Sequence, residues 1–287
     1  QLETIAQKLL GRLHENEYDG VIIYDIQDES SRTDKPRPFP FKQTVDPREY
    51  SHLLRNLSDQ DVITYKSVAQ RGVAEFKQWL SETKNQFNLK NLVLVGSPSS
   101  DGDIKLSLPD AYKVLSEQPQ DFFLGGVTIA ERHASKRNEH ERLLEKTTQG
   151  CKFFISQAVY NAQATVDLIT SYARSCKAQG IEPKRIILTF TPCGSEKTLE
   201  FMQWLGISVP DATKWRMLDS QNPLSESVRI CRENLDLILR SCAHLDVPLG
   251  LNIESLTNRK EEIDASINLY RLLKATMELN LAEKQIA

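Results

Sequence analysis

The sequence lacks several features that would place it in a specialised class of protein. Its five cysteines are odd in number and widely spaced, with no Cys-x-x-Cys pair, so neither a disulfide framework nor a zinc site of that type is predicted. No run approaches the roughly 18 apolar residues of a membrane helix, and the first residues lack the apolar block of a secretory signal. We therefore expect a cytoplasmic protein with no membrane partner.

The chain also lacks an excess of charge of one sign. Its 36 Lys and Arg residues stand against 39 Asp and Glu, which gives a formal net charge of -3. Nucleic-acid-binding proteins usually show a basic excess, so nucleic acid is not an expected partner. The 287 residues are 40% hydrophobic, which is ample for a core, and neither an internal repeat nor a low-complexity linker interrupts them. We predict a single domain over residues 1–287.

Short β-branched or aliphatic runs alternate with amphipathic stretches along the chain. This alternation is typical of parallel βαβ units. Helical periodicity is clear between Leu2 and Leu13 and between Val166 and Cys176. Seven strands are predicted, over Gly20–Ile26, Asp61–Tyr65, Asn91–Gly96, Phe122–Thr128, Lys152–Gln157, Arg185–Phe190 and Pro248–Ile253.

The order of these elements indicates the fold class. A TIM-type (β/α)8 barrel begins with a strand and has eight of them, whereas this chain begins with a helix and has seven predicted strands. We therefore predict an α/β fold of the (β/α)8 type with its first strand missing from the chain. A doubly wound open sheet is the alternative, and the absence of a Gly-x-Gly-x-x-Gly turn or a Walker loop disfavours it.

Two further segments bear on partners and on the site. From Leu224 to Leu245, apolar residues recur in alternating steps of four and three, which predicts an apolar seam on a long helix. This seam either packs against the rest of the domain or forms a contact between two copies in a homo-oligomer. The irregular insertion from Asp28 to Gln43 follows the first predicted strand and holds three Pro and two Phe. We expect it to be an ordered loop at the rim where barrel active sites are built.

Polar side chains follow most of the predicted strands, where a parallel barrel brings them to one rim. They include no Gly-x-Ser-x-Gly elbow, no Cys with an obvious His partner and no His pair at metal-ligand spacing, so acyl transfer and metal hydrolysis are disfavoured. Hydrogen-bonding side chains around a wide rim suit a planar heterocyclic ligand. The set is Tyr24, Asp25, Gln27, Tyr65, Lys66, Gly96, Ser97, Thr128, Glu131, His133, Gln157, Tyr160, Thr189, Thr191, Asn252 and Glu254.

Some of these positions have both a functional and a structural interpretation. His133 and Glu131 come just past a strand, and they either serve a site or belong to a solvated helix face. Gln157 ends an apolar strand, and a buried amide there either contacts a ligand or bonds to neighbouring backbone. A carboxylate at Glu254 needs solvent, a cation or a ligand, or else a salt bridge to Arg259 or Lys260.

Three phrases in the middle of the chain carry a family likeness. They are GGVTIAERH at 125–133, LLEKTTQGCKFFISQAVYN at 143–161 and RIILTFTPCGSEKTLEFMQWLGISVP at 185–210. The stretch that holds them resembles the methylenetetrahydrofolate reductases, flavoenzymes with a (β/α)8 barrel. Their corresponding motifs are Pro-Glu-x-His, Lys-x-x-x-Gly-Ala-x-Phe-x-x-Thr-Gln and Pro-Gly-Ile-x-Pro. The likeness is good over about a third of the chain and looser elsewhere, where ESSRT at 29–33 echoes a Glu-Arg-Asp-Arg-Thr loop.

The resemblance implies an oxidoreductase of one-carbon metabolism and methionine biosynthesis. Such an enzyme reduces 5,10-methylenetetrahydrofolate to 5-methyltetrahydrofolate, with FAD as cofactor and NADH or NADPH as hydride donor. The catalytic acid would be Glu254 or a Glu upstream of Gln1. The resemblance places folate contacts at Gln157, Tyr160, Phe201, Ser97 and Arg32, and FAD contacts at His133, Glu139, Lys146 and Thr128.

The sequence departs from the family on the flavin side of the site. The Arg-Gly-Asp of the family reads Val95-Gly96-Ser97 here, and the Tyr of its Tyr-Pro-Glu phrase is Ile129. Two other functions therefore stay open. One is a flavin-free protein that binds methyltetrahydrofolate or assists methyl transfer without redox activity. The other is an unrelated barrel enzyme that shares the fold alone.

Overall fold

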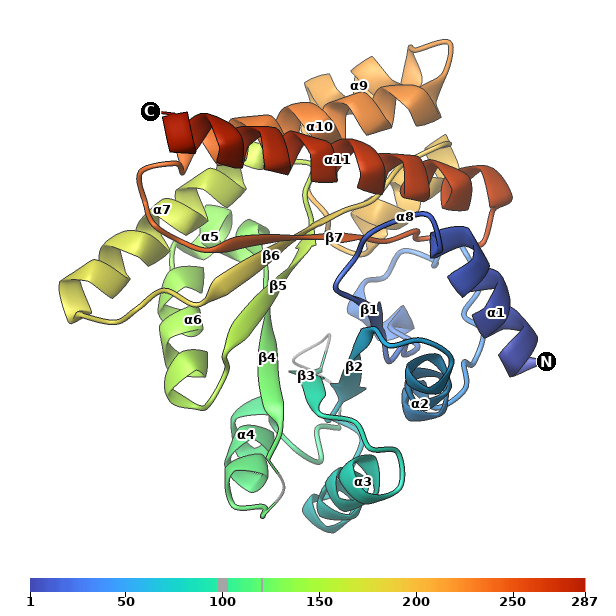
Figure 1. Ribbon diagram of the computed structural model, residues 1–287, viewed down its shortest axis with the longest axis vertical. Helices are drawn as coiled ribbons and strands as arrows, with labels where there is room; N and C mark the ends of the chain where they lie inside the picture. Colours follow the sequence, from blue (N-terminus) through green and yellow to red (C-terminus); the bar gives the residue numbers. More distant parts are fainter. Residues whose placement is uncertain (98–102, 120, 287) are drawn as a thin grey trace. The chain divides into compact units, whose positions relative to one another are not determined.

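The computed structural model describes residues 1–97, 103–119 and 121–286 (Figure 1). Strands alternate with helices over most of this length. The strands are β1 (Gly20–Ile23), β2 (Asp61–Ser67), β3 (Asn91–Val95), β4 (Phe123–Thr128), β5 (Phe153–Ala158), β6 (Arg185–Phe190) and β7 (Leu249–Ile253). The helices are α1 (Leu2–Leu13), α2 (Pro47–Leu57), α3 (Val73–Asn85), α4 (Leu108–Ser116), α5 (Ala130–Lys136), α6 (Glu139–Thr148), α7 (Ala162–Gln179), α8 (Glu196–Trp204), α9 (Asp211–Leu218), α10 (Pro223–Ser241) and α11 (Lys260–Ile286), with a short 3-10 helix, η1 (Ser30–Arg32).

The strands of the described residues are hydrogen-bonded in the order in which they occur in the chain, β1 to β7. The neighbouring strands run parallel in the pairs β1–β2, β2–β3, β3–β4, β5–β6 and β6–β7. A doubly wound sheet reverses its strand order at a switch point, and this sheet does not. Sequential parallel strands after an opening helix match a (β/α)8 barrel without its first strand. The predicted fold class and all seven predicted strands are therefore confirmed.

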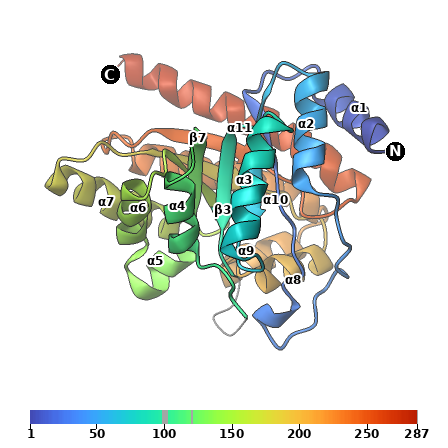
Figure 2. The same cartoon turned by 90° about the horizontal axis from the view of Figure 1, so that it is seen from below.

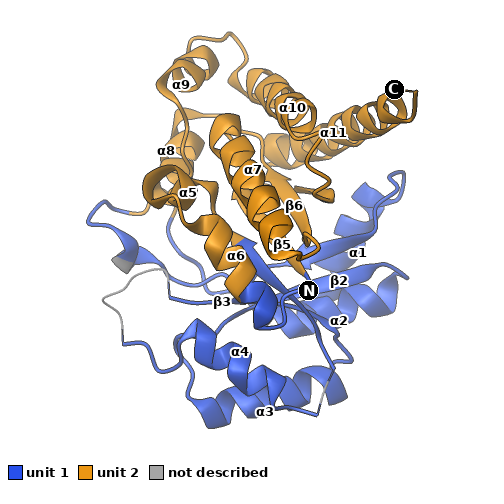
Figure 3. Ribbon diagram, turned by 90° about the vertical axis from the view of Figure 1, so that its left-hand side faces the viewer, with its two compact units in different colours: residues 1–36, 40–127, 146–152 blue, residues 37–39, 128–145, 153–287 orange. Residues whose placement is uncertain are grey.

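The chain divides into two compact units (Figure 3). Unit 1 contains residues 1–36, 40–127 and 146–152, and unit 2 contains residues 37–39, 128–145 and 153–287. Strands β1 to β3 and nearly all of β4 belong to unit 1, whereas β5 to β7 belong to unit 2. The single domain over 1–287 stays a prediction.

In unit 1, alternate side chains of the strands face the helices. Ala6 of α1, Leu54 of α2 and Val62 of β2 are buried together in one core cluster. Thr64, two residues along β2, donates its hydroxyl to Ser51 of α2 at 2.8 Å. Since strand side chains alternate between faces, Val62 and Thr64 share the helix-facing side of β2. Figure 2 shows α3 and α4 side by side in the same helix layer.

In unit 2, helix α7 covers strands β5 and β6, and Tyr172 meets Phe154 edge to face at 6.4 Å between ring centroids. The long helix α10 runs beside α11 (Figure 1). Its residues Cys231, Leu235 and Ile238 are fully buried. The apolar seam predicted on this segment therefore packs within the chain at these positions. The homo-oligomer stays a prediction.

None of the described helices is both long enough and apolar enough to cross a membrane.

Asp46 is the N-cap of α2. Its carboxylate accepts the backbone N–H of Arg48 at 2.9 Å and pairs with the Arg48 guanidinium at 2.8 Å. Burial opposes ionisation of Asp46, but the hydrogen bonds and the charge of Arg48 outweigh it and lower the pKa of the carboxyl below its usual value. The ionised carboxylate therefore stabilises the start of the helix.

We predict that Asp46→Ala lowers the free energy of unfolding by about 1 kcal/mol at neutral pH, because a helix cap is lost. The pKa is lower in the folded than in the unfolded chain, so this stabilisation is present above the unfolded pKa and is lost as pH falls through the folded pKa. Urea unfolding at a series of pH values measures both effects. The explanation is wrong if the unmodified protein and Asp46→Ala differ by a constant free energy of unfolding as the pH falls through the pKa of Asp46.

Candidate functional site

A bulge near the end of β5 sets the direction of Gln157. The pairing of β5 with β6 shifts in register between residues 155 and 158. The hydroxyl of Ser156 fills the gap, since it donates to the Gln157 carbonyl at 2.9 Å and accepts the backbone N–H of Thr189 at 2.9 Å. Ser156 thereby replaces a missing strand-to-strand bond and fixes the backbone from which Gln157 projects.

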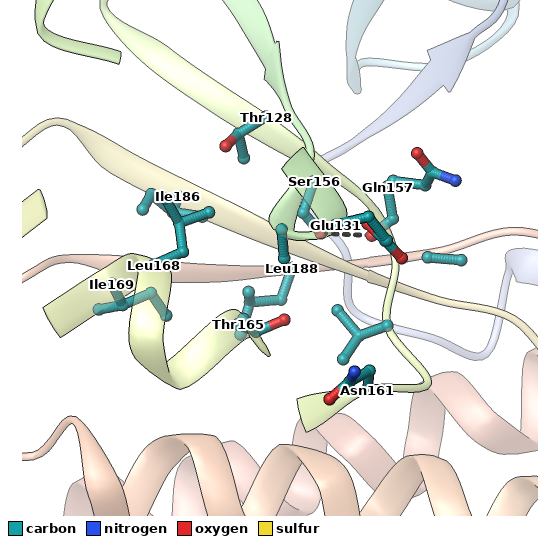
Figure 4. A pocket seen from close by; sticks show the side chains of 13 residues that line it. Thr128, Glu131, Ser156, Gln157, Asn161, Thr165, Leu168, Ile169, Ile186 and Leu188 are labelled. Carbon is teal, nitrogen blue, oxygen red and sulfur yellow. Dashed lines mark hydrogen bonds between the residues drawn. The ribbon is translucent and has the colours of Figure 1, made fainter. Parts of the chain in front are cut away.

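The Gln157 amide lies away from helix α7. Figure 4 shows it pointing to the side opposite Leu168 and Ile169. Its Nε2 donates to the carbonyl of Leu205, directly after α8, at 3.2 Å. This bond fixes the plane of the amide, and the partly exposed side chain keeps a second N–H and a carbonyl with which to contact a ligand.

Glu131, in the first turn of α5, holds the same connection between α8 and α9. Its Oε1 accepts the backbone N–H of Ser208 at 3.0 Å. Glu131 and Gln157 therefore anchor the two ends of the segment 205–208. Burial raises the pKa of Glu131 above its usual value, against the opposing effect of the Ser208 hydrogen bond. The carboxyl is thus protonated at a higher pH than an exposed Glu.

Glu131 and Gln157 also line a small cavity between β5, β6 and α7 (Figure 4). Thr165, Leu168 and Ile186 complete its walls. Its volume of about 10 Å³ corresponds to about one water molecule. A planar heterocycle therefore cannot enter there, and a ligand would meet Gln157 from its exposed side.

An aromatic cluster of Phe39, Phe201 and Trp204 lies beside Leu205. Phe201 stacks on Trp204 at 6.0 Å and meets Phe39 edge to face at 5.4 Å between ring centroids. The guanidinium of Arg37 lies 5.2 Å from the Phe201 centroid and 5.1 Å from that of Trp204. Trp204 precedes the residue that holds Gln157, so the structure brings Gln157 and Phe201 to the same part of unit 2.

Strands β6 and β7 add a polar row to this unit. Asn252 donates its side-chain amide to the Thr189 hydroxyl at 3.0 Å. Glu254 follows β7, and its backbone N–H continues the strand pairing by donating to Phe190 at 3.1 Å. Because side chains alternate along a strand, Asn252 and Glu254 share one face of β7. Glu254 therefore lies on the same side of the sheet as the hydrogen bond between Asn252 and Thr189.

The side chain of Tyr160 is buried and hydrogen-bonded to backbone. It is 2% exposed, and its hydroxyl donates to the Thr191 carbonyl at 2.6 Å. Burial raises its pKa well above the usual value for tyrosine. The side chain thus stabilises the loop after β6, and its assignment to a folate stays a prediction.

Two of the residues assigned to a flavin, Thr128 and Glu139, hydrogen-bond to each other. Both are fully buried, and Glu139 Oε1 accepts the Thr128 hydroxyl at 3.4 Å and the Ile129 backbone N–H at 3.0 Å. Its second oxygen lies 3.5 Å from the Arg142 guanidinium. Glu139 therefore holds the turn from β4 into α5.

The other two assigned residues, His133 and Lys146, also contact their own chain. His133 is 2% exposed, with Nε2 3.1 Å from the Ser171 hydroxyl of α7. Burial lowers the pKa of His133, so the imidazole is neutral at neutral pH. Lys146 is 6% exposed and donates to the Val127 carbonyl at 2.5 Å. The assignment of all four residues to FAD stays a prediction.

Arg32 and Ser97 belong to unit 1, as does Lys146, whereas the other residues with a predicted catalytic, folate or FAD role belong to unit 2. Arg32 ends η1 and pairs with Glu29 at 2.6 Å. Ser97 is partly buried two residues beyond β3. Their folate contacts stay predictions.

Three residues of this region were not singled out from the sequence: Arg37, Trp204 and Glu262. The Pro- and Phe-rich insertion that contains Arg37 was a usable signal, because an ordered loop at the rim was expected there. The sequence held no such signal for Glu262, since it is one of two adjacent Glu residues at the start of α11. It is 2% exposed, and its carboxylate accepts the Gly194 N–H at 3.0 Å.

Glu262 also accepts the Thr198 hydroxyl at 2.7 Å and the Thr257 hydroxyl. It therefore ties the loop after β6 and the start of α8 to α11. Gly194 suits this close approach, since a Cβ there would lie 3.0 Å from Glu262 Oε1 and would crowd the carboxylate. Among the described residues, no cluster of three or more His, Cys, Asp or Glu is arranged to hold a metal ion.

Comparison with known proteins gives one informative likeness. No family model matches the chain, and no curated protein matches it. A solved structure of an uncharacterized protein from Clostridium thermocellum, which binds two copies of 5-methyl-5,6,7,8-tetrahydrofolic acid, is 35% identical in sequence. The comparison covers 96% of this chain and 88% of that one, with a TM-score of 0.80.

Two other solved structures are much more distant. N-(5'-phosphoribosyl)anthranilate isomerase from Pyrococcus furiosus is 10% identical, with a TM-score of 0.47 over 96% of this chain and 93% of that one. EDTA monooxygenase from a Chelativorans species is 9% identical, with a TM-score of 0.49 over 97% of this chain and 87% of that one. Neither supports an argument about function.

We predict that Glu262→Ala lowers the free energy of unfolding by about 3 kcal/mol, because it leaves buried donors without an acceptor. Urea unfolding measures the change. The matched control is Glu261→Ala, at the exposed neighbouring position, where we expect a change within about 0.5 kcal/mol. Equal effects of the two substitutions would show that the carboxylate does not hold the loop.

Proposed function

The chain belongs to the same family as that Clostridium thermocellum protein, and from this membership we propose that it binds a reduced folate, 5-methyltetrahydrofolate. The single observation that carries the proposal is the ligand of that relative. The binding face in this proposal lies in unit 2, near the ends of β5 and β7, where Gln157 and Asn252 are partly exposed.

The chemistry of this face suits a pterin. A pterin is planar and presents ring N–H and amino donors beside a carbonyl acceptor along one edge. The Gln157 amide offers both an acceptor and a donor, and its bond to Leu205 holds it in one orientation. Phe201 and Trp204, which are 5% and 6% exposed, pack behind this amide and support the end of α8 to which it bonds.

FAD, which the resemblance to the reductases implies, does not fit this structure. The four residues assigned to it are at most 6% exposed, and each bonds to its own chain. They offer no accessible polar surface to a flavin. The proposal is therefore a folate-binding protein without FAD, which acts by holding 5-methyltetrahydrofolate or by presenting it for methyl transfer.

A second candidate is the reduction of 5,10-methylenetetrahydrofolate, favoured by the raised pKa of Glu131. The reaction needs a proton at N10 while the bond from N10 to the methylene carbon breaks and an iminium forms at N5. A hydride from NADH or NADPH then adds to the methylene carbon and leaves 5-methyltetrahydrofolate. Glu131 or Glu254 would supply the proton from unit 2.

We predict that Gln157→Ala raises the Kd for 5-methyltetrahydrofolate by a factor of about 5 to 150, because a hydrogen-bonding partner of the pterin is lost. Titration calorimetry gives the Kd. Gln163→Ala is the matched control, since Gln163 is an exposed amide on α7 that bonds to Asp167. Absence of folate binding by the unmodified protein would refute the proposed function.

For the reductase candidate, we expect the purified protein to oxidise NADH or NADPH when 5,10-methylenetetrahydrofolate is present. Glu131→Gln should reduce that rate by a factor of about 100 or more, because the substitution removes the acid. Loss of nicotinamide absorbance measures the rate. If the unmodified protein binds folate but oxidises no nicotinamide, the reductase candidate fails and the binding proposal stands.

A further inference from the structure

A second cavity lies between helices α10 and α11 of unit 2, which run side by side (Figure 1). Its volume is about 130 Å³, against about 10 Å³ for the cavity beside Gln157. One water molecule fills the smaller volume, so the larger one has room for a small organic molecule. Side chains of both helices line it, and most of them are polar or charged. The chemistry of these side chains therefore determines which ligand the cavity suits.

Asn280 of α11 brings a buried amide to this cavity. The residue is 9% exposed and lines the cavity wall. No other residue that the structure describes hydrogen-bonds to its side chain, whereas the hydroxyl of Thr276, one turn earlier, donates to the Leu272 carbonyl at 2.8 Å. A buried amide without a partner lowers stability, and such groups are rare in folded proteins. We therefore expect the contents of the cavity to bond to Asn280.

Two acidic side chains of the cavity already have partners in the chain. Glu233 of α10 pairs with Arg216 of α9 at 2.6 Å, and Asp236 pairs with Arg240 at 3.1 Å. Arg216, and not the adjacent Arg232, donates the hydrogen bonds that Glu233 accepts. These charges are therefore largely neutralised before a ligand arrives.

Arg232 of α10 and Glu283 of α11 are the charged lining residues that remain. Both are exposed, and within the described part of the chain neither forms an ion pair. The cavity therefore presents one cation, one anion and one amide to a ligand. An α-amino acid carries a carboxylate and an ammonium group on the same carbon atom. A guanidinium binds the first of these groups and a carboxylate binds the second.

We propose that this cavity binds a free α-amino acid with an aliphatic side chain. Arg232 binds its carboxylate, Glu283 binds its ammonium group, and the Asn280 amide bonds to either one because it is both donor and acceptor. Leu279, a lining residue that is 61% exposed, gives the aliphatic side chain an apolar surface to pack against. The inference is independent of the folate proposal, since these residues belong to α10 and α11 and not to the strands that carry Gln157 and Asn252.

Titration calorimetry with three ligands tests the assignment: L-leucine, L-leucinamide, which lacks the carboxylate, and N-acetyl-L-leucine, which lacks the ammonium group. We expect the unmodified protein to bind L-leucine with a Kd of about 1 mM or below. Each derivative should bind at least about 10-fold more weakly, because a charged hydrogen-bonding pair is lost.

Two substitutions at exposed positions connect each charge of the ligand to one residue. R232Q should raise the Kd of L-leucine by a factor of about 10 to 100 and leave that of L-leucinamide unchanged. E283Q should raise the Kd of L-leucine by a similar factor and leave that of N-acetyl-L-leucine unchanged. K284Q is the matched control, because it removes a charge from an exposed residue beside Glu283 that does not line the cavity. We expect it to change none of the three Kd values.

N280L separates binding from folding. It should abolish binding of L-leucine while the thermal unfolding temperature stays the same or rises, because a buried polar group without a partner is removed. A lower unfolding temperature would overturn the role of Asn280 in the site. The proposal itself is overturned if the unmodified protein does not bind L-leucine, if the three ligands bind equally well, or if R232Q and E283Q leave the Kd of L-leucine unchanged. Folate binding stands or falls separately in each case.

Discussion

The register shift at Ser156 is the constraint on which the candidate site depends. Strand side chains alternate strictly between two faces, so a change of one residue in register exchanges the faces that side chains occupy. By bonding through its hydroxyl to Thr189, Ser156 lets β5 continue beside β6 after the shift. The amide of Gln157 consequently meets the end of α8, and the aromatic cluster lies next to it.

The fold was readable from the sequence to a large extent. All seven strands are short β-branched or aliphatic runs that stood out between amphipathic helices. Inner strands such as β3 and β5 are largely buried, whereas β1 and β7 are only partly buried. The start of α2 has an equally local cause, because Asp46 followed by proline has a specific capping chemistry. Local residue patterns fix such features, and distant contacts do not alter them.

The site was harder to foresee, because it depends on contacts between distant residues. Gln157 was identified, but its partner Leu205 lies 48 residues away. Tyr160 follows a strand as a ligand-binding residue would, yet packing against α10 and the loop after β6 buries it. Glu262 was missed because its donors come from the loop after β6, the first turn of α8 and the loop before α11. The sequence pattern identifies strand ends, and it does not report which side of each strand a polar residue faces.

The insertion that carries Arg37 has proline at positions 36, 38 and 40. Each proline fixes its own φ angle and restricts the residue before it, so residues 35, 37 and 39 have few backbone conformations available even in the unfolded chain. Little entropy is then lost when this segment takes up its place on α8. The contacts of Arg37 with Phe201 and Trp204 therefore form at a low cost in conformational entropy.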